Sequence, residues 1–170
     1  MRISIIGQPG SGKSTLAIKI SKKFNIPHFQ IDRFYLESGG GELKIGNSEK
    51  RDKVRAYVKE KVLEFVNLDS WVSDGTYLKS QVVIVEHVDQ IIYLDIPPYR
   101  RLLNILKRMF TKERHKEITL WGDIKFIFQT IRLTPMRSRK LKNFVKEHKD
   151  KIKILRNYKE VNLYLNSLNR

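Results

Sequence analysis

Short apolar runs alternate along the chain with stretches in which apolar residues recur every three or four positions. Such runs predict buried strands, and the three-to-four spacing predicts helices that pack one face on a sheet. Because the two patterns alternate from end to end, they favour an α/β fold, a parallel sheet flanked by helices, over separate helical and sheet domains. The predicted strands are Ile3–Ile6, His28–Ile31, Trp71–Ser73, Ile91–Ile96 and Ile152–Leu155.

Prolines help to bound the predicted helices, because proline suits the first turn of a helix and interrupts its interior. Pro97-Pro98 opens one helix, and Pro135 separates two others. Residues 76–88 are ambiguous, since Val82–Val85 has strand propensity but leaves little room before the strand at 91; we expect a short helix there. Apart from this short helix, the predicted helices are 13–24, 49–66, 98–110, 122–133, 137–148 and 158–168.

Composition narrows the class of protein. The chain has 170 residues, of which 41% are hydrophobic, so we expect one domain over 1–170 with a single core. The chain has no cysteine, which excludes disulfides and thiolate metal sites. No apolar run approaches the length of a membrane span and no secretory signal pattern is present, so we expect a cytoplasmic protein without a membrane partner.

The positive charge is unevenly distributed. The formal net charge is +16; residues 1–99 hold 14 Lys and Arg against 12 Asp and Glu, whereas residues 100–170 hold 20 against 6. A positive field of this kind attracts polyanions, such as nucleotide phosphates, nucleic acid or an anionic membrane surface. The alternative for most individual lysines is a solvated surface.

One short segment carries a specific chemical signal. Residues 7–14 read GQPGSGKS, which fits the phosphate-binding pattern G-x-x-x-x-G-K-[ST] and lies between a predicted strand and a predicted helix. The glycines allow close backbone approach, and the amides and helix dipole attract phosphate. Lys13 can reach the β- and γ-phosphates, and the Ser14 hydroxyl can bind Mg²⁺. The alternative is a glycine-rich turn that matches by coincidence.

Two aspartates follow predicted strands at the edge where the loop lies. Asp74 ends the third strand and precedes Gly75, which suits a Mg²⁺ ligand, with an ordinary turn as the alternative. Asp32 ends the second strand and could orient or deprotonate a phosphate acceptor, with a helix cap as the alternative.

Arginines in the basic half could stabilise charge on a transferring phosphoryl group. Arg108 and Arg114 flank a short polar stretch after the helix at 98–110, an arrangement similar to a lid hinge. The glycine-rich stretch 38–47 is either a flap over the acceptor or a plain surface loop. Five more arginines could take the same role, although a solvated arginine on a helix face is the simpler interpretation of each: Arg100, Arg101, Arg132, Arg137 and Arg139.

Taken in order along the chain, these motifs resemble the adenylate-kinase-related P-loop kinases, and most of all the group labelled DNA topology modulation proteins. The resemblance spans nearly the whole chain. It rests on residues 7–15, 26–28, 31–35, 74–77, 93–97, 107–109 and 154–156.

The resemblance implies a three-layer α/β fold of the nucleoside-monophosphate-kinase type with a five-stranded parallel sheet, an acceptor-side flap at about 36–66 and a short lid at about 108–120. It also implies ATP and Mg²⁺ as cofactors, with Asp74 near the metal, Arg108 in the lid and the turn at Arg156 against the adenine. The residues that this resemblance and the loop pattern assign to the nucleotide are Gly7, Gln8, Pro9, Gly10, Ser11, Gly12, Lys13, Ser14, Thr15 and Arg156.

The chain departs from that group at three places. Asn104 stands where an arginine is usual, Thr76 stands where asparagine is usual, and the expected Arg-Pro-Asp run of the lid is absent. The resemblance does not specify the phosphate acceptor.

Two functions of different classes follow. The first is an ATP- and Mg²⁺-dependent phosphotransferase acting on a small acceptor such as a nucleoside or nucleotide, with Lys13, Asp32, Arg108 and Arg114 as catalytic residues and Ser14 and Asp74 at the metal. The second is a nucleic-acid-binding protein with a regulatory or vestigial ATP site, in which the basic residues of 100–159 contact phosphates. A membrane-surface helix at 122–133 is a third reading, although its apolar side also suits a core.

Overall fold

The sheet has five parallel strands in the order β2-β3-β1-β4-β5. The computed structural model describes residues 1–40, 48–76, 78–110, 135–136 and 138–168. Strand β1 is central, and its Ile5 lies opposite Asp74 of β3 and Ile92 of β4. The strands are β1 (Arg2–Gly7), β2 (His28–Gln30), β3 (Trp71–Asp74), β4 (Gln90–Leu94) and β5 (Ile152–Leu155).

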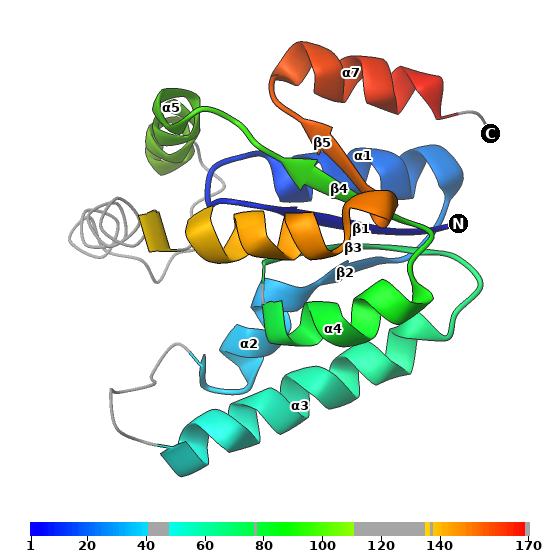
Figure 1. Ribbon diagram of the computed structural model, residues 1–170, viewed down its shortest axis with the longest axis vertical. Helices are drawn as coiled ribbons and strands as arrows, with labels where there is room; N and C mark the ends of the chain where they lie inside the picture. Colours follow the sequence, from blue (N-terminus) through cyan, green and yellow to red (C-terminus); the bar gives the residue numbers. More distant parts are fainter. Residues whose placement is uncertain (41–47, 77, 111–134, 137, 169–170) are drawn as a thin grey trace.

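Helices cover both faces of the sheet (Figure 1). Helices α1 and α7 lie on one face, and α3, α4 and the helix at 138–147 lie on the other. Helix α5 lies beyond the carboxyl end of β4. The bounds are α1 (Lys13–Phe24), α2 (Ile31–Glu37), α3 (Ser48–Val66), α4 (Leu78–His87), α5 (Pro98–Phe110), the 3₁₀ helix η2 (Lys149–Lys151) and α7 (Tyr158–Ser167).

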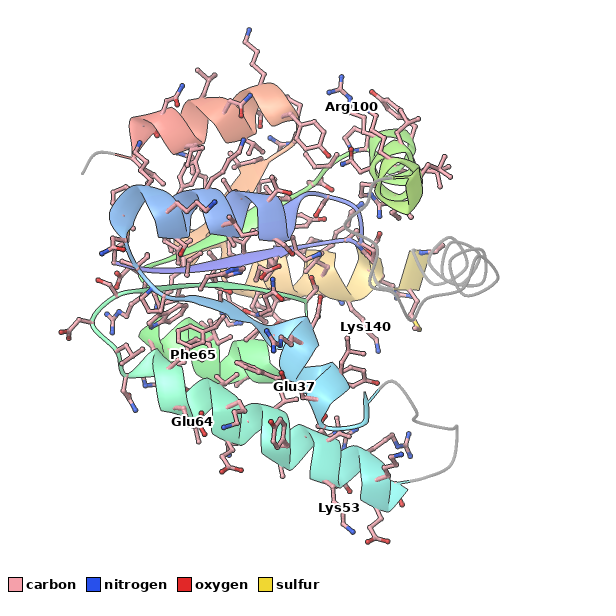
Figure 2. The ribbon with its side chains drawn as sticks, turned by 180° about the vertical axis from the view of Figure 1, so that it is seen from behind. Glu37, Lys53, Glu64, Phe65, Arg100 and Lys140 are labelled. Carbon is pink, nitrogen blue, oxygen red and sulfur yellow. The ribbon has the colours of Figure 1, made fainter. Side chains whose placement is uncertain are left out.

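Alternation along the strands divides the core into two clusters. On β1, Ile3 and Ile5 pack with α1 and α7, whereas Ile6 packs with α3 and α4. Phe65 of α3 lies in the same cluster as Ile6. Its ring stacks on Phe29 with 4.3 Å between centroids, and Figure 2 shows it against the sheet. The two faces of each strand therefore have different neighbours.

The predicted α/β fold with a five-stranded parallel sheet is confirmed, as is the helix expected within 76–88. The prediction for the second strand was wrong at its end, because β2 stops at Gln30 and Ile31 begins helix α2. Ile31, Phe34 and Tyr35 have helical spacing and pack in the same cluster as α3, which favours a helix here. The predicted helix at 122–133 lies outside the described residues.

In the part of the chain that the structure describes, each helix is too short or too polar to cross a membrane.

Candidate phosphate-binding site

The glycine-rich segment forms the turn between β1 and α1 at the carboxyl edge of the sheet. Gly7 is the last residue of β1, and Gly12 precedes α1 with a φ of 92°. The N-terminus of a helix concentrates backbone N–H groups and the positive end of the helix dipole, which together attract anions. The observed loop therefore has the local structure that the phosphate-binding pattern requires.

Gly10 shows why the loop needs glycine. Its φ is +78°, a left-handed value that side chains rarely adopt, and a Cβ there would lie 2.5 Å from the carbonyl oxygen of Arg101. Ser11, the next residue, is fully buried, and its hydroxyl has no hydrogen-bond partner within the described chain. Buried hydroxyls are normally paired, so this one fits a loop built to receive a polar group.

Ser14 and Asp74 are brought together by the fold. The Ser14 hydroxyl donates to Oδ2 of Asp74, with 2.5 Å between the oxygens, and the Asp74 side chain is only 5% exposed. Hydroxyl and carboxylate oxygens are the ligands that Mg²⁺ prefers, and the ion is usually held by one or two protein oxygens together with substrate phosphates. The described residues contain no cluster of three or more His, Asp or Glu that could hold a metal without phosphates. The donor set therefore fits a phosphate-bound Mg²⁺.

Lys13 lies in the first turn of α1, directly before Ser14. Its Nζ donates to the carbonyl oxygen of Gln8, 3.4 Å away, so the side chain folds back along the loop. The ammonium group therefore lies over the segment whose amides would bind phosphate.

His28 is a site residue that the sequence analysis missed. Its Nε2 lies 2.6 Å from Oδ1 of Asp74, and the His28 side chain is 14% exposed. A carboxylate oxygen can only accept, so Nε2 donates. The two oxygens of Asp74 are thus engaged by two different side chains, one from α1 and one from β2.

Thr76, one of the three departures from the kinase group, contacts the start of the loop. Its hydroxyl donates to the carbonyl oxygen of Gly7 at 2.6 Å and accepts from the Gly7 N–H at 3.2 Å. The end of β3 and the end of β1 are therefore tied together directly below the loop.

Asn104, the second departure, contacts the loop from the other side. Its Nδ2 donates to the carbonyl oxygen of Gly10 at 2.8 Å and to the hydroxyl of Tyr158. A Cβ on Gly12 would lie 3.7 Å from the Tyr158 ring. Helix α5, the loop and the start of α7 therefore meet at one point.

Two further predicted site residues, Asp32 for the acceptor and Arg156 for the adenine, lie in different surroundings. Asp32 lies in the first turn of α2, with Oδ1 3.3 Å from the position of a Cβ on Gly75, so it borders the Asp74 site. Arg156 is exposed, and its N–H donates to Glu160 in the turn before α7.

Two arginines of α5 face different environments. Arg101 is 6% exposed and its Nε donates to the carbonyl oxygen of Ile96; burial lowers the pKa of its guanidinium. Arg100 is exposed and extends from the outer side of α5 (Figure 2). Arg101 is therefore held at the carbonyl oxygen of Ile96, and its own backbone oxygen borders Gly10 of the loop. Arg114, Arg132, Arg137 and the Arg108 side chain lie outside the described residues, as does most of the predicted lid.

Comparison with known proteins places the chain in a family. A model of the AAA domain family matches residues 6–125, which is more than half of the chain and includes the loop, Asp74 and Asn104. The chain belongs to the AAA domain family.

This AAA domain chain is also similar to adenylate kinases. It is 30% identical over 124 residues to the adenylate kinase of Baumannia cicadellinicola, an alignment covering 64% of the chain and 58% of that relative. It is 28% identical over 127 residues to a putative adenylate kinase of Sulfurisphaera tokodaii, covering 74% of the chain and 58% of the relative. The chain thus matches 58% of the length of each of these two relatives.

Solved structures agree on the fold of this AAA domain. Deoxyadenosine kinase from M. mycoides matches with a TM-score of 0.58 and 20% identity, covering 99% of both chains. Shikimate kinase from Bacteroides thetaiotaomicron matches with a TM-score of 0.53 and 19% identity, covering 81% of this chain and 82% of that one. At these identities the likeness shows the fold alone.

Proposed function

We propose that this chain is an ATP- and Mg²⁺-dependent phosphotransferase that acts on a small acceptor such as a nucleoside or nucleotide. The observation that carries the proposal is the Ser14–Asp74 hydrogen bond directly beside a glycine loop at a helix N-terminus. Phosphoryl transfer requires backbone amides that bind the phosphates, a lysine, and a pair of hard oxygen ligands for the metal. The similarity to adenylate kinases supports the same class of reaction.

The chain's own residues have separate tasks in this proposal. The loop amides hold the β- and γ-phosphates, and Lys13 moves from the Gln8 carbonyl to the phosphate oxygens. Ser14 and Asp74 would hold Mg²⁺, which when bound neutralises charge on the phosphates. Asp32, at the edge of the Asp74 site, orients the acceptor or takes its proton.

The remaining assignments also belong to the proposal. Arg108 and Arg114 of the 108–120 lid would stabilise charge on the transferring group, and residues 36–66 would border the acceptor. The turn at Arg156 would border the adenine. We also propose that the chain belongs to the DNA topology modulation group, on the motifs at residues 7–15, 26–28, 31–35, 74–77, 93–97, 107–109 and 154–156.

The test is Mg²⁺-dependent phosphate transfer from ATP to a panel of nucleosides, nucleotides, small metabolites and 5′-hydroxyl oligonucleotides. Lys13→Ala is expected to lower turnover by at least about 100-fold, because it removes the cation that would neutralise charge on the phosphates. Lys19→Ala, an exposed lysine on the same helix, is the matched control and should leave turnover unchanged. Unchanged turnover in a folded Lys13→Ala protein would exclude this function.

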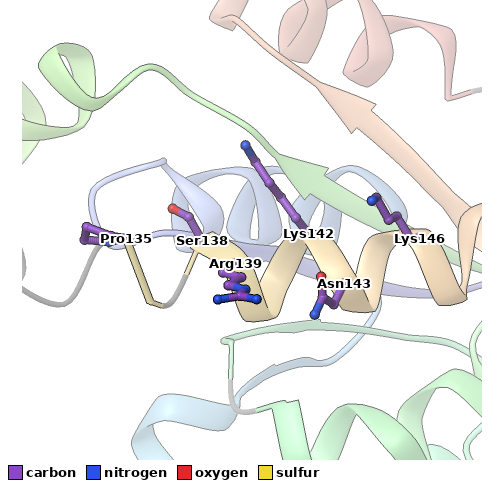
Figure 3. Close-up of a pocket in the computed structure, with 6 residues that line it drawn as sticks. All are labelled: Pro135, Ser138, Arg139, Lys142, Asn143 and Lys146. Atoms are coloured by element: carbon purple, nitrogen blue, oxygen red, sulfur yellow. The ribbon is translucent and has the colours of Figure 1, made fainter.

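A second candidate, nucleic-acid binding, is favoured by one observation. A shallow groove of about 350 Å³ on the outer side of the helix at 138–147 carries three cations and no acidic side chain among its described lining residues (Figure 3). Gln8 of the loop donates to Ser138 at its edge, at 3.2 Å. The lining residues are Pro135, Ser138, Arg139, Lys142, Asn143 and Lys146.

Binding to duplex DNA at increasing salt tests this candidate. Contacts with phosphates release counterions, so affinity should fall steeply as salt rises. A triple variant Arg139→Gln, Lys142→Gln, Lys146→Gln should weaken binding and flatten the salt dependence. A wild-type protein that binds no DNA at low salt would exclude the candidate.

A further inference from the structure

The position of His28 follows from the packing of its neighbour. Phe29 stacks on Phe65, with ring planes 9° apart, and Trp71 contacts Phe65 from the adjacent strand. Successive strand residues face opposite sides of a sheet. His28 therefore faces α1, on the same side of the sheet as Asp74.

His28 is also the outer member of a chain of hydrogen bonds. Ser14 donates to one oxygen of Asp74 at 2.5 Å, and His28 Nε2 donates to the other at 2.6 Å. The side chains of Asp74 and His28 are 5% and 14% exposed. Bulk water therefore has little access to compete for the oxygen that His28 occupies.

We propose that His28 is a positioning residue for the carboxylate of Asp74. The last torsion of an aspartate side chain is soft and nearly two-fold, so a carboxylate held at one oxygen can still reorient. The donor from β2 removes that freedom and keeps the opposite oxygen directed at Ser14, the residue that would hold Mg²⁺ together with Asp74. This inference rests on the proposed function and adds to it a residue from a different strand.

A purely structural histidine would behave differently. Its loss would lower stability but leave the contribution of Mg²⁺ to ATP binding unchanged. A positioning histidine instead acts on the metal: outer partners of metal ligands typically change metal affinity by about 10- to 100-fold when they are replaced. The Mg²⁺-dependent part of ATP affinity therefore distinguishes the two roles.

The experiment compares two variants of His28 whose side-chain amides differ in reach. The side-chain amide of His28→Gln extends about as far as the original Nε2, whereas that of His28→Asn is one methylene shorter and falls short of Asp74. ATP dissociation constants are measured by calorimetry with Mg²⁺ and with EDTA, and thermal unfolding checks the fold. His87→Gln, on α4 and bonded to the Val83 carbonyl, is the matched control.

We expect the gain in ATP affinity that Mg²⁺ provides to be about 10-fold smaller in His28→Asn than in the wild type. The ATP affinity in EDTA should be unchanged. His28→Gln should retain most of that gain, and His87→Gln all of it. Equal Mg²⁺ gains in His28→Gln and His28→Asn, whether normal or reduced, would overturn the role of His28 alone. A wild-type protein that gains no affinity from Mg²⁺ would instead overturn the proposed function, and this inference with it.

Discussion

The side-chain amide of Asn104 donates to the carbonyl oxygen of Gly10, with 2.8 Å between nitrogen and oxygen. The same amide donates to the hydroxyl of Tyr158, so a single side chain connects the loop to α5 and α7. Asparagine stands here in place of the arginine expected from the kinase group, and its short length suits a contact made directly with the loop backbone. Asn104 therefore provides the loop with an uncharged hydrogen-bond donor from α5.

Asn104→Ala should lower both stability and nucleotide affinity. The Gly10 carbonyl loses its donor from α5, which should cost about 1–3 kcal/mol in the free energy of unfolding. The loop is then less well ordered before binding, so ATP should bind several-fold more weakly. Denaturant unfolding and calorimetric titration with ATP measure the two effects.

Leu103→Ala provides the control for that prediction. Leu103 is the preceding residue on α5 and is 53% exposed, so its truncation perturbs the same helix without touching the loop. We expect near wild-type ATP affinity in this variant. An Asn104→Ala protein that matched Leu103→Ala in both measurements would contradict the role given to Asn104.

Thr76→Val should destabilise the junction of β1 and β3. Valine has nearly the same shape but no hydroxyl, so both hydrogen bonds to Gly7 are lost. We expect the free energy of unfolding to fall by about 1–3 kcal/mol in denaturant titrations. Thr76→Ser keeps the hydroxyl and should retain most of the stability; the prediction fails if serine and valine are equally destabilising.

Asp89 should make the stability of the sheet depend on acid pH. Partial burial alone would raise the pKa of the Asp89 carboxyl, but the backbone N–H and guanidinium of Arg2 together lower it below its ordinary value. A lowered pKa means that the folded state binds the proton less readily than the unfolded state. The stability from Asp89 is therefore complete above the unfolded pKa and is lost as pH falls through the folded one.

Asp89→Asn tests that linkage. At neutral pH its melting temperature should lie a few degrees below that of the wild type, and the difference should shrink as pH falls through the acidic range. ATP affinity should not change, because Arg2 and Asp89 lie at the opposite end of β1 from the loop. A difference in melting temperature that is constant with pH would rule out the ion pair as its source.

Much of the fold could be predicted because it depends on local patterns. The five strands and the helix within 76–88 follow from apolar spacing, and each predicted strand overlaps an observed one. Helix α2 is not among the predicted helices, because the strand predicted from the sequence extends to Ile31, although Ile31, Phe34 and Tyr35 have helical spacing. A short segment of mixed pattern takes its structure from the surface it packs on, here α3.

The sequence by itself determined the phosphate loop, since a run of glycines, a lysine and a serine between a strand and a helix carries its own geometry. It also indicated Ser14 and Asp74. Only the tertiary structure decided what surrounds them: His28 on Asp74, Thr76 on Gly7 and Asn104 on Gly10, which join residues 46, 69 and 94 positions apart. Strand order and helix packing create such contacts, and no local pattern records them.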